Sequence, residues 1–159
     1  MLPQPKAKIK RNFAFDYETV CDRLRAIGAT EKFPIKLDEA TQHHTFHRYY
    51  ISGLYGGGTV DTFPRVDKEK ARVHGIDNFC FPCLDFNPHA PVNPGDPGLF
   101  FEAGLVDRPL PNMRTFVRLS AGKWLYCGTY QFIPSQSLTP QEFQRQPDKV
   151  RLCCKVSGR

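Results

Sequence analysis

The chain has 159 residues, of which 40% are hydrophobic and 24% charged, with a formal net charge of +6 at pH 7. These values are typical of a globular protein large enough to bury a core, and they exclude a wholly disordered chain. Because no run approaches the roughly 20 apolar residues of a membrane span and no secretory signal is present, we expect an intracellular protein, nuclear or cytoplasmic, with reduced cysteines and no membrane partner.

The first segment, residues 1–12, reads as a basic flexible arm. Its cations are Lys6, Lys8, Lys10 and Arg11, and it contains no acidic residue. Residues 145–159 are also basic, so the middle of the chain is slightly acidic. Basic ends bind nucleic acid through counterion release or are simply solvated, and both interpretations stay open. We expect residues 13–159 to form a single globular domain.

Residues 16–27 are predicted to form a helix. Val20, Leu24 and Ile27 recur at three- and four-residue spacing, and Gly28 follows where a C-terminal cap is common.

A second helix is predicted over residues 38–53. The residues of its expected apolar stripe are Phe46, Tyr50 and Ile51. His43 and His47 would share one face of this helix at i, i+4 spacing, which zinc proteases use, but the glutamate of their motif is missing. We interpret this face as exposed. Residues 68–72 fit either a short helix or a loop.

Residues 74–101 are rich in proline, which rules out a long helix. The phenylalanines and leucines of this stretch are expected to be buried anchors on extended segments. Its last four residues, Gly98–Phe101, are predicted to form a short strand.

Residues 114–119 and 123–133 are the clearest strands, and the short Ser-Ala-Gly link between them predicts a hairpin. Alternation places Thr115, Val117 and Leu119 on one face with Leu125, Cys127 and Thr129. The opposite, basic-aromatic face would carry Arg114, Phe116, Arg118, Trp124, Tyr126 and Gly128.

A third helix is predicted over residues 139–146. Thr139 suits the N-cap, Pro140 the first helical position, and Glu142 the third position of a capping box. The segment 148–156 fits a helix or a strand.

Four residues are candidate zinc ligands: His74, Cys80, Cys83 and His89. Cys80 and Cys83 have the CxxC spacing of a zinc knuckle, and the histidines flank them. The alternative is a pair of buried cysteines in an aromatic segment, because there is no second CxxC. No local signature of a catalytic cysteine, phosphate loop or carboxylate pair is present, so whether the chain is an enzyme stays open, with the balance against it.

The second hairpin face has the chemistry of a nucleic-acid surface. Aromatic rings stack on bases, and arginine and lysine pair with phosphates. The candidate binding residues are Arg114, Arg118, Lys123, Trp124, Tyr126 and Tyr130 on the hairpin, with Lys8, Lys10 and Arg11 of the arm. The alternative is that Trp124 and Tyr126 pack beneath a helix.

Three stretches, HGIDNFCFPCLDFNPHAPVNPGDPGLFF, the W-x-Y-x-G-x-Y hairpin and SLTPQEF, resemble a fungal family of unknown function, domain family 6697, over roughly residues 74–151. The resemblance implies no activity and no catalytic residue. The hairpin is also similar, at fold level only, to β-barrel readers of modified DNA in bacterial restriction systems.

We therefore expect an α+β domain with a curved, mainly antiparallel sheet or partly open β-barrel and about three peripheral helices. The expected function is a non-enzymatic nucleic-acid-binding module, with reading of modified DNA bases as one form of it. The alternatives are a protein-interaction or scaffold domain of a larger fungal protein, which would bind other protein domains, and a metal-dependent enzyme. No cofactor is expected unless zinc binds at the CxxC.

Overall fold

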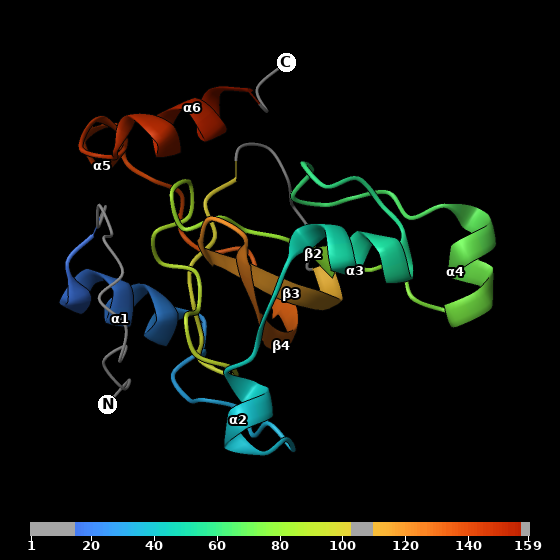
Figure 1. The fold of residues 1–159 in the computed structure, drawn as a ribbon. Helices are drawn as coiled ribbons and strands as arrows, with labels where there is room; N and C mark the ends of the chain where they lie inside the picture. Colours follow the sequence, from blue (N-terminus) through green and yellow to red (C-terminus); the bar gives the residue numbers. More distant parts are fainter. Residues whose placement is uncertain (1–14, 103–109, 157–159) are drawn as a thin grey trace.

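The fold is α+β, built on an open four-stranded mixed sheet in the order β1-β4-β3-β2 (Figure 1). The computed structural model describes residues 15–102 and 110–156. The strands are β1 (Thr45–Phe46), β2 (Phe79–Cys80), β3 (Leu110–Ser120) and β4 (Lys123–Phe132). The predicted arm, residues 1–12, lies outside the described residues.

The long β3–β4 hairpin is the centre of the sheet. β1 pairs with β4 antiparallel, and β2 pairs with β3 in parallel, so two short strands extend the hairpin on its two sides. Ser120 pairs with Lys123, and Gly122 has a φ of 69°, which suits the tight turn between the strands. The hairpin predicted from alternation is therefore confirmed.

Six helices accompany the sheet in the described part of the chain: α1 (Tyr17–Ala26), α2 (Glu39–Gln42), α3 (Arg48–Tyr55), α4 (Lys68–His74), α5 (Pro140–Gln144) and α6 (Asp148–Val156). The predicted capping box of α5 is present, with the side chains of Thr139 and Glu142 each bonded to the other residue's backbone N–H. None of these helices is long and apolar enough to span a membrane.

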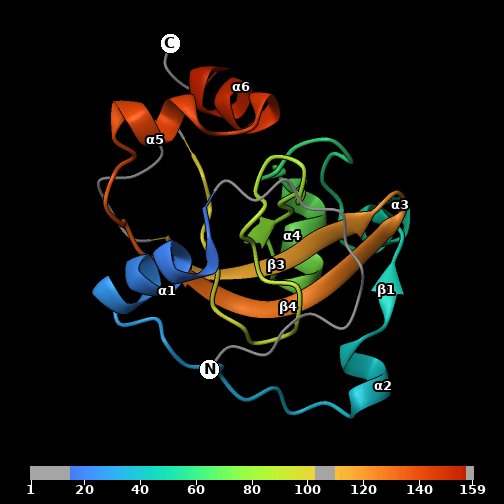
Figure 2. The same cartoon turned by 90° about the vertical axis from the view of Figure 1, so that its left-hand side faces the viewer.

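The single helix predicted over residues 38–53 is wrong. The segment forms α2, then the strand β1, then α3, and Figure 2 shows β1 and α3 beside the tip of the hairpin. His43 is the C-cap of α2 and His47 the N-cap of α3, so they do not share a helix face. Pairing of Thr45 and Phe46 with Leu125 and Trp124 covers the edge of β4, which a continuous helix over these residues would leave unpaired.

The short strand predicted at Gly98–Phe101 is also absent from the described sheet. The backbone N–H of Leu99 donates to the carbonyl of His89 at 2.9 Å, and that of Phe101 to Oδ1 of Asn87 at 2.7 Å. Both side chains are buried, as expected of anchors. Hydrogen bonds to residues of an irregular loop, and not to a neighbouring strand, therefore hold this segment in place.

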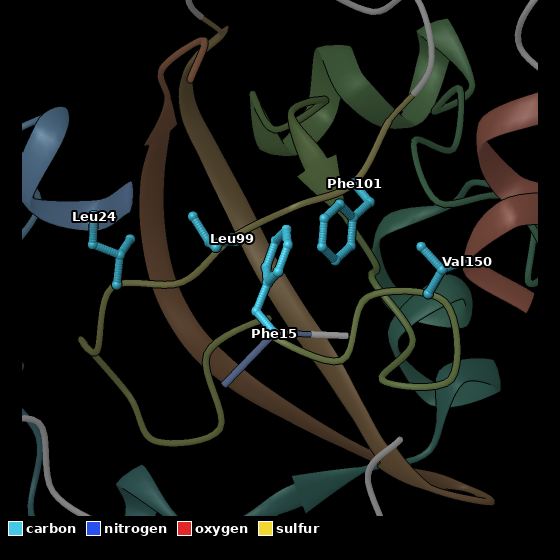
Figure 3. Packing of buried hydrophobic residues seen from close by; sticks show 5 residues of the cluster. All are labelled: Phe15, Leu24, Leu99, Phe101 and Val150. Atoms are coloured by element: carbon cyan, nitrogen blue, oxygen red, sulfur yellow. The ribbon is translucent and has the colours of Figure 1, made fainter. Parts of the chain in front are cut away.

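The core consists of several apolar clusters rather than one layer. One cluster joins α1 and α6 to the loop segments that cross the sheet, and its members are Phe15, Leu24, Leu99, Phe101 and Val150 (Figure 3). A second cluster covers one face of the hairpin and a third covers the other. Both hairpin faces near its tip are thus packed.

Candidate nucleic-acid interface

The aliphatic face of the hairpin is buried as alternation predicts. Val117 and Leu125 pack with Leu84 and Ala90 of the proline-rich loop, and Val117 is completely inaccessible to solvent. Cys127 belongs to the same cluster, and burial raises the pKa of its thiol. This face is core and carries no binding chemistry.

The opposite face carries a cross-strand row of an aromatic, an indole and a cation. Phe46 of β1 pairs with Trp124 of β4, which pairs with Arg118 of β3. Trp124 is half-buried, and its ring meets that of Phe81 edge-on at 5.6 Å between centroids. The row therefore runs from the edge strand β1 across β4 to Arg118 of β3, which is half-buried.

Arg48, a residue that the sequence analysis did not single out, lies between this row and the core. It is only 4% exposed, and its guanidinium carbon lies 3.2 Å from the centroid of Phe81 and 5.4 Å from that of Trp124. Its spacing, three residues before the buried Ile51, is the signal that could have placed it on the inner face of α3.

Hydrogen bonds of Arg48 tie the glycine-rich loop after α3 to the sheet. Its Nη2 donates to the carbonyls of Gly58 at 2.6 Å and Asp61 at 3.0 Å, while its Nε has no partner among the described residues. Burial lowers the pKa of Arg48 to about 10, so the side chain stays charged at neutral pH. The buried cation of Arg48 thus stabilises the basic-aromatic face around Trp124.

Three hairpin cations were predicted to contact phosphate, and they differ in their surroundings. Arg114 donates to Oδ1 of Asn78. Within the described part of the chain, the side chains of Arg118 and Lys123 have no hydrogen-bond or ion-pair partner; Arg118 is half-buried and Lys123 exposed. Arg118, which pairs with Trp124, is therefore a cation of this face that is available to a ligand, and Lys123 is an exposed cation at the hairpin turn.

Tyr126 lies on the predicted face and is half-buried. Its ring contacts that of Phe116, its cross-strand partner, at 4.9 Å between centroids. Its hydroxyl lies 3.1 Å from Oγ1 of Thr129. Part of this ring remains accessible beside Phe116.

Tyr130 does not lie with Trp124 and Tyr126, contrary to the prediction. The strand register shifts between Thr115 and Phe116, so Thr129 joins the face of Tyr126, and Tyr130 packs against the aliphatic cluster. Its hydroxyl donates to the carbonyls of Asp96 and Cys127, and burial raises its pKa. Tyr130 is therefore half-buried against the aliphatic cluster, on the side of the sheet away from Trp124.

Two exposed tyrosines beside this face were missed by the sequence analysis. Tyr49 and Tyr50 of α3 are 70% and 58% exposed. They were overlooked because residues 38–53 were treated as one helix with Tyr50 in its buried stripe. Their position becomes clear only when β1 is placed against β4.

The structure does not bring the four zinc candidates together: no group of at least 3 potential ligands stands at metal-binding distance among the described residues. Nε2 of His74 lies 2.9 Å from the carbonyl of Tyr55, and Nε2 of His89 accepts a hydrogen bond from the backbone of Phe15. Cys80 is completely buried, and burial raises its pKa. Each of these three is used in packing or backbone bonding.

A groove of about 680 Å³ opens at the other end of the hairpin. Its wall includes Phe63, Phe100 and Phe132, whose rings meet edge-on with centroids 5.4–6.3 Å apart. Tyr130 also lines the groove. The predicted arm contacts, Lys8, Lys10 and Arg11, lie outside the described residues.

Comparison with known proteins identifies a family. Neither a search of the curated proteins nor a search of the solved structures returned a match. The family model described as a domain of unknown function, DUF6697, matches residues 45–156, a wider range than the resemblance suggested because it begins at β1 and includes α3 and α4. Since the match covers more than half of the chain, this protein belongs to the DUF6697 family.

Proposed function

We propose that the chain is a non-enzymatic nucleic-acid-binding module of an intracellular protein, nuclear or cytoplasmic. The observation that carries the proposal is a pair of cations whose side chains have no partner among the described residues: Arg118, on the face of the half-buried Trp124 and Tyr126, and Lys123, at the hairpin turn. Phosphates would pair with the cations, and bases would stack on the rings.

The roles differ from residue to residue. Arg118 and Lys123 would contact phosphate directly, and Arg114 would do so only by exchanging its bond to Asn78. Tyr126 would offer the accessible part of its ring. Trp124 would act chiefly by holding the face in shape, because Arg48 and Phe81 already contact its ring.

Reading of modified DNA bases is the narrower form of the proposal. It requires a pocket that encloses a flipped base, with aromatic walls and polar groups at the base edge. Trp124 and Tyr126, which lie on the same face of β4, would be the walls of that pocket.

The test is a binding titration of the full chain with fluorescein-labelled DNA and RNA, followed by anisotropy at about 50 and 200 mM salt. We expect binding at the lower salt that weakens steeply at the higher. Replacing Arg118 and Lys123 together by alanine should weaken binding at least about fivefold, since each phosphate contact contributes to affinity.

The matched control replaces Arg65 and Lys68, which are exposed residues elsewhere in the chain, and should leave binding nearly unchanged. Absence of binding at the lower salt would overturn the proposal. If the two double variants lost affinity equally, the hairpin face would not be the binding site, and the binding would be a general electrostatic attraction.

A second candidate function is a protein-interaction domain. The supporting observation is the groove of about 680 Å³ with its aromatic wall, which is large enough for several side chains of an extended peptide. The proline-rich stretch itself is mostly buried, although Phe86 is exposed. The same titration separates the two candidates, because a protein-binding domain would show no affinity for DNA or RNA.

A further inference from the structure

Tyr49 and Tyr50 are exposed aromatic residues on the helix nearest to the hairpin tip. Their side chains are 70% and 58% exposed, and neither hydroxyl has a hydrogen-bond partner among the described residues. Two large aromatic side chains exposed next to each other are a candidate contact surface, because each combines an apolar ring with a polar hydroxyl.

Each ring lies against a second ring, that of His47 at the N-cap of α3 or that of Phe46 in β1. Tyr49 lies nearly parallel to His47, with centroids 5.2 Å apart and planes 13° apart. Tyr50 lies nearly parallel to Phe46, with centroids 6.4 Å apart and planes 7° apart. A ring that is already oriented loses little conformational entropy when a ligand stacks on its outer side.

These ring pairs lie next to the end of the hairpin that carries Arg118 and Lys123. A Cβ placed on Gly122 would lie 3.3 Å from Cδ2 of His47, so the hairpin turn touches the ring beneath Tyr49. Lys123 is the next residue after this turn. On the other side, Phe46 leads through Trp124 to Arg118 in the cross-strand row.

We infer that this surface binds single-stranded nucleic acid, with Tyr49 and Tyr50 as stacking platforms and Lys123 and Arg118 as phosphate contacts. The inference rests on the proposed function and names its ligand. In a duplex the base faces are covered by their neighbours, so exposed rings can stack only on bases that are unpaired and unstacked. Cations beside the rings pair with the phosphates that link such bases.

The experiment compares four ligands of about 12 nucleotides at about 50 mM salt: oligo-dT, oligo-U, a DNA duplex and an RNA duplex. We expect the full chain to bind at least one of the single strands at least about tenfold more tightly than the duplex of the same sugar. The affinities for oligo-dT and oligo-U, compared with each other, show whether the sugar matters.

The variants test the stacking residues. Tyr49→Ala combined with Tyr50→Ala should weaken binding to the single strand at least about tenfold, because stacking on each ring contributes separately. Tyr49→Phe combined with Tyr50→Phe should retain affinity within about twofold, because the rings remain. The matched control is Tyr17→Ala, an exposed tyrosine on α1, which lies away from α3 in both ribbon views (Figures 1 and 2).

Each outcome decides the question. Duplex binding equal to or tighter than single-strand binding overturns the inference and leaves the proposed function standing. Unchanged affinity of the double alanine variant, with its far-ultraviolet circular dichroism and unfolding midpoint unchanged, also overturns it. Absence of binding to all four ligands overturns the proposed function as well.

Discussion

At the scale of single residues, Arg48 and Gly128 shape the hairpin faces. Arg48 places a buried cation between Phe81 and Trp124 and binds the carbonyls of the following loop. Gly128 is buried with a φ of 128° next to the ring of Phe33. Because a side chain is strained in that conformation, Gly128 permits the register shift that turns Tyr130 to the core.

Gly128→Ala should lower the free energy of unfolding by at least about 2 kcal/mol. The new Cβ would lie 2.7 Å from Cζ of Phe33, and the backbone would be strained as well. Urea unfolding followed by the fluorescence of Trp124, the single tryptophan, measures the change.

The matched control variant is expected to change the free energy of unfolding in the opposite direction. Gly53 lies within α3, and a Cβ there meets nothing within 4 Å. Gly53→Ala should therefore raise the free energy of unfolding by about 0.5–1 kcal/mol. If the two variants shifted stability in the same direction, the conformational account of Gly128 would be wrong.

At the scale of elements, local signals and tertiary contacts compete. The α5 helix begins where its capping box predicts, and Glu142 also accepts a bond from Arg23 of α1 at 2.7 Å. One carboxylate thus starts a helix and joins it to another. In residues 38–53 tertiary pairing prevails, because β1 completes the edge of the hairpin beside β4.

Glu142 should make stability depend on pH. The backbone bond from Thr139, followed by the bond from Arg23, lowers the pKa of Glu142 in the folded state below its ordinary value of 4.5. Its stabilising contribution is therefore fully present above 4.5 and is lost as the pH falls through the folded-state pKa.

We accordingly expect wild type to be more stable than Glu142→Gln at pH 7, with the difference shrinking as the pH falls below about 4. Urea unfolding of both chains across this pH range is the measurement. A difference that stays constant or widens toward acid would contradict the assigned cause.

At the scale of the whole molecule, the excess of basic residues lies at the two ends of the chain. The arm carries Lys6, Lys8, Lys10 and Arg11 without an acid, and the chain as a whole has a net charge of +6. If the hairpin face provides local contacts, the arm should mainly strengthen their salt dependence.

Replacing all four arm cations by glutamine should reduce the slope of log affinity against log salt for a single strand by up to about 3 units. The preference for single strand over duplex should stay unchanged, because it depends on Tyr49 and Tyr50. Anisotropy titrations at four salt concentrations measure both quantities. An unchanged slope would show that the arm makes no phosphate contact.

Local patterns predicted much of this fold. Alternation over residues 114–133 predicted the hairpin and its aliphatic face, and the Thr139–Glu142 box predicted the start of α5. Both depend on interactions between residues close in the chain, whose geometry repeats from protein to protein. The observed sheet and helices confirm the predicted α+β class, and the family match confirms the predicted resemblance.

The candidate site was decided by contacts between distant segments. The partners of Trp124 are residues 81 and 48, which come from two other parts of the chain. The side to which Tyr130 turns depends on a register shift that alternation cannot reveal, and the exposure of Tyr49 and Tyr50 depends on β1 pairing with β4. Sequence by itself determined which chemistry the hairpin carries, because side-chain types and local periodicity are written in the chain. Only the tertiary structure decided which of those side chains meet solvent, because burial depends on neighbours that are remote in sequence.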